Sequence, residues 1–107
     1  MKLSAAILKG MERFPKQATN GHYFDGKTAA CAMGTAYWAF NDQEGYDAPS
    51  QRIVDGTAYP VRMDHAMCFF DYSLTKFERA YGVDIETCSD QGIPREDIAG
   101  MLMAIGE

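Results

Sequence analysis

The feature that most constrains this chain is a run without charged residues between Thr28 and Phe40. More than half of its residues are alanine, glycine or cysteine, with bulky side chains such as Met33 and Trp38 between them. Such a run has good helix propensity and lets neighbouring backbones approach closely. The turn pair Asp25-Gly26 precedes it. We therefore predict a helix from Thr28 to about Phe40 that lies buried at the centre of the fold.

Amphipathic patterns on both sides predict three further helices that cover the central one. The first helix ends before Pro15, because the residue before a proline disfavours helical geometry. The second runs from about Asp64 to Tyr81, with Gly82 suited to a left-handed cap. The last has Pro94 in its first turn. The apolar positions that repeat at helical spacing are Leu3, Ala6, Ile7, Met11 and Phe14 in the first, Ala66, Phe70, Leu74, Phe77 and Tyr81 in the second, and Ile98, Met101, Leu102 and Ile105 in the last.

Residues 41–63 are the least regular part of the chain, and we expect a long loop there. Ile53-Val54 and Ala58-Tyr59 flank the turn pair Asp55-Gly56 and could form a short hairpin. The fold class that follows is mainly α: a small single-domain helical bundle of about four helices over residues 1–107, with any strand confined to this hairpin.

Charge and length exclude several functional classes. The 107 residues include 10 Lys and Arg against 15 Asp and Glu, which gives a net charge of −5. Because the basic residues are spread along the chain, we expect no nucleic-acid binding, although an acidic surface could meet a basic protein. No run approaches the ~20 apolar residues of a membrane helix, so we expect no membrane association.

The three cysteines, Cys31, Cys68 and Cys88, are odd in number and widely spaced. A secreted disulfide scaffold would leave one thiol unpaired. The N-terminal residues contain no apolar core long enough for a signal peptide. We therefore expect reduced thiols and a cytoplasmic location.

Cys31 is the first candidate for chemistry, because it lies near the start of the predicted central helix. Unpaired N–H groups at a helix start favour a thiolate, which could act as a nucleophile. The alanines around Cys31 instead indicate burial, which disfavours the thiolate. We interpret Cys31 as a buried, inert thiol and keep the nucleophile as the alternative.

His65-x-x-Cys68 is the second candidate, since this spacing could supply half of a zinc site on one helical turn. Cys31, Cys88 or His22 would have to complete it, and no second closely spaced pair is present. Nucleotide-binding loops and hydrolase motifs are also absent from the sequence. We assign no catalytic, cofactor-binding or metal-ligating residue and expect no cofactor.

Aromatic side chains in or beside the predicted loops could line a partner surface or cover the edge of the core. We favour core packing, because small domains use aromatic side chains to close their ends. These residues are His22, Tyr23, Phe24, Tyr46, Tyr59 and Tyr72.

Two segments together resemble small uncharacterised bacterial and phage proteins. One runs from Asp25 to Ala36 and contains Cys-Ala-Met-Gly, and the other runs from Ile85 to Ala99. Those proteins pair a turn and a Cys-Ala-x-Gly helix with a late Ile-x-x-x-Asn-Asp turn and a short closing helix. Ser89 replaces the asparagine of that pattern, and Pro94 replaces a serine cap. The resemblance covers about a third of the chain and implies no activity.

The function that we predict from the sequence is a small cytoplasmic helical module that binds another protein or regulates it, in a bacterial or phage setting, rather than an enzyme. The alternative is a small thiol or metal-assisted enzyme that uses Cys31, or His65 with Cys68. The oligomeric state is left open.

Overall fold

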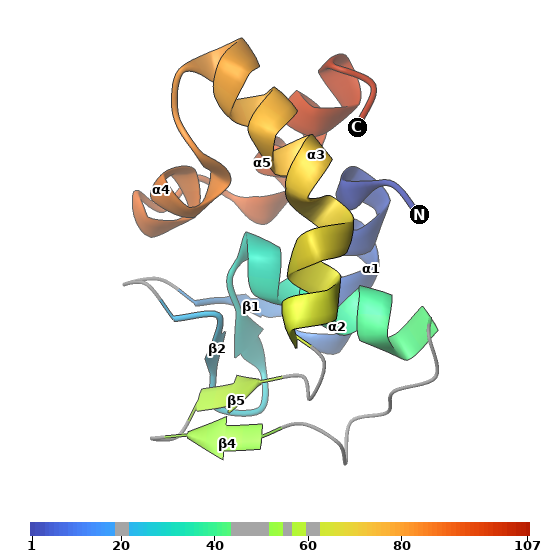
Figure 1. Ribbon diagram of the computed structural model, residues 1–107. Helices are drawn as coiled ribbons and strands as arrows, with labels where there is room; N and C mark the ends of the chain where they lie inside the picture. Colours follow the sequence, from blue (N-terminus) through green and yellow to red (C-terminus); the bar gives the residue numbers. More distant parts are fainter. Residues whose placement is uncertain (19–21, 44–51, 55–56, 60–62) are drawn as a thin grey trace.

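Helix α2 (Ala32–Gln43) lies at the centre of the computed structural model, and α1, α3 and α4 pack against it (Figure 1). The structure describes residues 1–18, 22–43, 52–54, 57–59 and 63–107. Most side chains of α2 are buried, from Ala32 to Asn41. The predicted buried central helix is therefore confirmed.

Glycines let two backbone segments approach α2 closely. Helix α1 (Leu3–Arg13) crosses it at Gly10, where an added Cβ would collide with the backbone of Thr35. On α2 itself, a Cβ at Gly34 would collide with the carbonyl oxygen of Tyr23. The small residues of the sequence therefore serve close packing, as their pattern predicts.

The other predicted helices are also present, and the mainly α fold class is confirmed. They are α3 (Met63–Tyr81) and α5 (Arg95–Ala104), while α1 ends two residues before Pro15. Gly82 has a φ of 73°, and its N–H donates to the carbonyl of Glu78 over 2.8 Å. This is the left-handed cap that the sequence predicts for α3.

A small sheet corrects two of our expectations. Strands β1 (Lys16–Gln17), β2 (Phe24–Asp25) and β3 (Ala29–Ala30) form it in the order β1-β3-β2. Strand β3 pairs parallel with β1 and antiparallel with β2. The prediction of a helix from Thr28 was therefore wrong, because Ala29 and Ala30 make strand hydrogen bonds before the helix begins. Confining all strands to the central hairpin was wrong for the same reason.

The predicted hairpin is present as β4 (Arg52–Val54) and β5 (Thr57–Tyr59), which pair antiparallel with Ile53 opposite Ala58. Its turn pair Asp55-Gly56 lies outside the described residues. The same holds for residues 44–51 and 60–62 of the predicted loop.

The short helix α4 (Ile85–Asp90) was not predicted, and with it the described residues contain five helices. Its start is capped by Asp84, whose side chain accepts a hydrogen bond from the Thr87 N–H over 2.7 Å. Ile85 and Cys88 are its buried apolar positions. Six residues are too few for the periodicity of a helix to show in a sequence.

Arg95, the first residue of α5, is buried, with 4% of its surface exposed. Its guanidinium donates to the carbonyl oxygens of Phe14 over 2.7 Å, Ala30 over 3.2 Å and Pro15 over 3.1 Å. The side chain thereby ties α5 to the end of α1 and to β3. Burial lowers the pKa of Arg95, since a low-dielectric environment disfavours the charged form.

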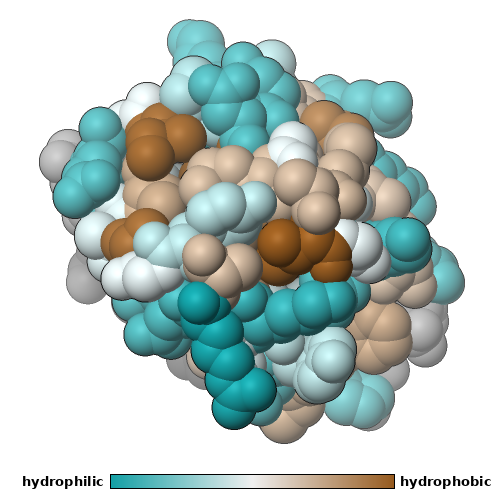
Figure 2. Space-filling model, turned by 90° about the horizontal axis from the view of Figure 1, so that it is seen from above, coloured by the Kyte–Doolittle hydropathy of each residue, from teal (hydrophilic) through white to brown (hydrophobic). Residues whose placement is uncertain are grey.

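The surface over α5 and the end of α3 mixes hydrophobic and hydrophilic side chains (Figure 2). Seen from above, over α5 and the last turns of α3, the most hydrophobic side chains form separate spots among hydrophilic ones (Figure 2). Within the described residues, no helix is both long and apolar enough to cross a membrane.

The α1–α2 crossing generates a stability prediction with a matched control. Gly10→Ala should destabilise the fold by about 1–3 kcal/mol, because the added methyl meets the rigid backbone of Thr35. Gly100→Ala on α5 should instead stabilise it by about 0.5–1 kcal/mol, since nothing lies within 4 Å of the new Cβ. Thermal or urea unfolding of the two variants measures both effects, and an unfolding midpoint that rises for Gly10→Ala would contradict the observed crossing.

Candidate functional site

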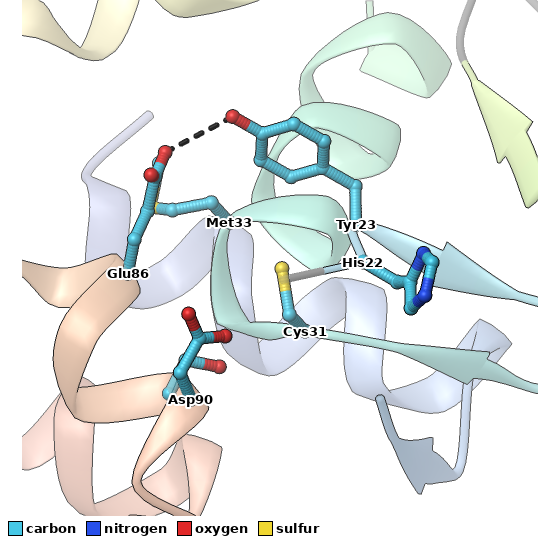
Figure 3. A pocket seen from close by; sticks show the side chains of 7 residues that line it. His22, Tyr23, Cys31, Met33, Glu86 and Asp90 are labelled. Atoms are coloured by element: carbon cyan, nitrogen blue, oxygen red, sulfur yellow. Dashed lines mark hydrogen bonds between the residues drawn. The ribbon is translucent and has the colours of Figure 1, made fainter. Parts of the chain in front are cut away.

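A cavity lies between the start of α2, helix α4 and the residues just before β2 (Figure 3). Its volume is about 80 Å³, which is well below the ~300–1,000 Å³ of typical small-ligand sites. Its lining combines a thiol, two carboxylates, an imidazole and a phenol. The residues are His22, Tyr23, Cys31, Met33, Glu86, Ser89 and Asp90.

Side chains of the cavity wall accept hydrogen bonds from the first turn of α2. The Gly34 N–H donates to Cys31 Sγ over 3.3 Å, and the Ala32 N–H donates to Ser89 Oγ over 3.4 Å. The N–H of Cys31 itself donates to the Tyr23 carbonyl over 2.9 Å. Because N–H groups at a helix start need acceptors outside the helix, Cys31 and Ser89 act as its caps.

Burial raises the pKa of the Cys31 thiol, and this is the largest influence on it. The N–H groups of Gly34 and Met33 lower the pKa, whereas the negative charges of Glu86 and Asp90 raise it further. The thiol is therefore protonated at neutral pH, and the cavity around it carries a negative potential. Cys31 is buried as predicted, while its inertness stays a prediction.

Tyr23 connects the cavity wall to α4. Its hydroxyl donates to Glu86 Oε1 over 3.0 Å, and its ring lies 5.6 Å from that of Tyr37, between centroids. Figure 3 shows the Tyr23 hydroxyl and the Glu86 carboxylate directed toward each other, while the His22 ring points away from both. Glu86 is thus held in place by a residue more than 60 positions earlier in the chain.

His65 and Cys68 do not join Cys31 at this cavity. Both are exposed on α3, and the ring of His65 lies edge-on to Phe40, with centroids 6.1 Å apart. Cys88, the third thiol, is buried in α4, and burial raises its pKa. In the part of the chain that the structure describes, no three His, Cys, Asp or Glu side chains are grouped so that they could hold a metal ion.

A second hollow, which we call the α3–α4 groove, runs along α3 toward α4. It is open to solvent and has an empty volume of about 810 Å³. Glu86 belongs to its lining as well as to that of the cavity, so the two hollows adjoin. The groove is lined by Tyr37, Met67, Cys68, Asp71, Leu74 and Glu86.

Large apolar side chains are exposed on both sides of α3, with Met67 in this groove and Phe69 and Tyr72 in the hollow on the other side. Met67, Phe69 and Tyr72 of α3 have 42%, 50% and 72% of their surface exposed. Tyr72 thus contradicts our preference for core packing, and His22 is exposed too, whereas Phe24 is fully buried and Tyr23 half-buried. Tyr46 and the side chain of Tyr59 lie outside the described residues.

Sequence reasoning missed Glu86 and Asp71 as parts of one site. Each is an ordinary charged residue in a helix, and no motif selects it. The only available signal was the spacing on α3, since Met67, Asp71 and Leu74 recur at intervals of four and three residues and so share a face.

No family, curated protein or solved structure matches this chain.

The positions of the three thiols predict their order of reactivity. Cys68 should be alkylated first in the native protein, and Cys31 and Cys88 more slowly than in protein unfolded by urea. Mass spectrometry of peptides after a timed iodoacetamide pulse measures all three. Cys31→Ala should cost on the order of 1 kcal/mol of stability, because it removes a buried sulfur and one cap. A native Cys31 that reacts faster than the unfolded control near neutral pH would favour the thiol enzyme instead.

The cap of α4 predicts a pH-dependent contribution to stability. Hydrogen bonds from Thr87 lower the pKa of Asp84 in the folded protein. The contribution is therefore present above the ordinary pKa of aspartate and is lost as the pH falls through the lowered folded value. Asp84→Ala should cost about 0.5–1 kcal/mol at pH 7 and progressively less in acid, as measured by urea unfolding between pH 7 and pH 2. Asp84→Asn keeps a capping oxygen, so it should retain most of the stability at pH 7.

Proposed function

We propose that this protein is a small module that binds another protein or regulates it, and that its binding surface is the solvent-exposed part of α3. The observation that carries this proposal is the exposure of Met67, Phe69 and Tyr72 on a single helix. Aromatic residues and methionine are enriched where proteins bind one another. The net charge of −5 and the scattered basic residues argue against nucleic acid as the partner.

The distribution of exposed apolar side chains distinguishes α3 from the rest of the surface. Six large apolar side chains of the described residues are exposed, and three of them are on α3. Met1, Leu8 and Met103 are the others, on the N-terminus, α1 and α5. Single exposed apolar residues are normal on any protein, whereas neighbouring ones that form a patch indicate a contact surface, and Phe69 and Tyr72 line one hollow together.

Neighbouring rings hold part of this face rigidly. The ring of Phe69 lies 4.6 Å from that of Phe40 and 5.0 Å from that of Phe70, between centroids. Phe70 is buried in the core, so Phe69 is supported from below while half of its surface faces solvent. A side chain that is already ordered loses little conformational entropy when a partner covers it.

We propose that the protein is of bacterial or phage origin and is located in the cytoplasm. Cys31, Cys68 and Cys88 are all free thiols in the structure, which is the form that thiols keep in a reducing compartment. The thiol or metal-assisted enzyme has less support, because Cys31 is protonated and lies apart from the exposed pair His65 and Cys68.

Selection of peptides on the purified protein tests the binding face. A random library of 12-residue peptides displayed on yeast is enriched for binders, and each is then measured against Met67→Ser. We expect this variant to weaken binding at least about fivefold, because it removes an apolar contact at the interface. Met103→Ser on α5 is the matched control, since it removes another exposed methionine, 54% against 42% for Met67, from a different element.

Circular dichroism should show that both variants keep the wild-type helix content, as expected for substitutions at exposed positions. If no peptide is enriched, or if binders tolerate Met67→Ser as well as Met103→Ser, α3 is not the binding face and the proposal fails.

A further inference from the structure

We propose that the partner is a basic polypeptide segment, which lies in the α3–α4 groove with an apolar side chain against Met67 and Leu74 and a lysine or arginine beside Asp71 and Glu86. This inference rests on the proposed function and names the chemistry of the partner. It is argued from the charges of the groove, its apolar floor and the anchoring of Glu86.

The charges of the two sides of α3 differ. Among the described residues, the lining of the α3–α4 groove contains two carboxylates, Asp71 and Glu86, and no lysine, arginine or histidine. The hollow on the other side of α3 is lined by Phe69 and Tyr72 together with Asp71, Lys76 and Arg79. A cationic segment therefore complements the first side and is opposed by two cations on the second.

The negative potential continues from the groove along α4. Asp90 lies one helical turn after Glu86, and both carboxylates line the cavity next to the groove. Their charges contribute to the raised pKa of the Cys31 thiol in the same cavity.

An anion is a poor fit to the same place. The start of α2 faces the cavity, and a helix start can attract anions through its N–H groups. Here Ser89 Oγ and Cys31 Sγ already accept the N–H groups of Ala32 and Gly34. The carboxylates of Glu86 and Asp90 in the cavity wall repel an anion.

The carboxylate of Glu86 is positioned before any partner arrives. The Tyr23 hydroxyl donates to its Oε1, and the Tyr23 ring packs against Tyr37, which is buried and also lines the groove. A cation that binds Glu86 therefore meets a carboxylate of fixed position, which reduces the entropy lost on binding. The apolar floor of Tyr37, Met67 and Leu74 lies in the same groove.

The peptide selection described above also tests this inference. Binders that depend on Met67 should be enriched in lysine and arginine relative to the starting library. A synthetic copy of the strongest binder is then compared with a copy in which each lysine is acetylated and each arginine is replaced by citrulline. The neutral copy should bind at least about fivefold more weakly at low salt, and the difference should shrink as salt screens the charges.

Charge-removing variants locate the contact on the protein. Glu86→Gln keeps an oxygen that accepts the Tyr23 hydrogen bond, and Asp71→Asn is similarly conservative. Each should weaken the basic peptide about two- to fivefold and leave the neutral copy unaffected. Glu78→Gln is the matched control, because Glu78 is exposed on α3 but lines neither hollow.

The outcomes separate this inference from the function on which it rests. Peptides that depend on Met67 but lack basic enrichment, or that bind Glu86→Gln and Asp71→Asn as tightly as Glu78→Gln, overturn the basic partner and leave the binding face of α3 in place. If no peptide depends on Met67, the binding face and the basic partner are both wrong.

Discussion

The structure depends on how closely other backbone segments approach α2. Gly10 brings α1 against the backbone of Thr35, and Gly34 admits the carbonyl of Tyr23. A side chain at either glycine would separate these layers, because backbone atoms cannot give way as a flexible side chain can. The position of Tyr23 follows from this packing, and with it the position of the cavity and of the Glu86 carboxylate.

Polar side chains form hydrogen bonds with backbone groups that the close packing buries. The start of α2 is capped by Cys31 and Ser89, and the buried guanidinium of Arg95 supplies donors to three carbonyl oxygens around the small sheet. Removing such a group would leave buried polar atoms without a partner, which costs more than the hydrogen bond contributes. Cys31 and Arg95 therefore have structural roles that explain their burial without any catalysis. The side chains that remain available for function are the exposed ones along α3 and α4.

The elements that were predicted correctly and those that were missed differ in length. Helices α1, α3 and α5 have ten or more residues, so their apolar stripes repeat often enough to be read. Strands β1 to β3 have two residues each and α4 has six, which is too short for a period to show. At Ala29 and Ala30 the helix propensity of alanine was overruled, because strand pairing with β1 and β2 uses their backbone groups.

The sequence by itself determined the mainly α fold class, the buried central helix, the left-handed cap at Gly82 and the short hairpin, since each depends on local propensity or spacing. It also determined the acidic net charge. Only the tertiary structure decided which side chains share a surface: Tyr23 with Glu86, Arg95 with Phe14, and Asp71 with Glu86 along one groove. These pairs are separated by 15 to 81 positions in the chain, and no local pattern specifies a contact between residues so far apart. They form because α1, α3 and α4 each bury an apolar face against α2, and the direction of the polar side chains follows from that packing.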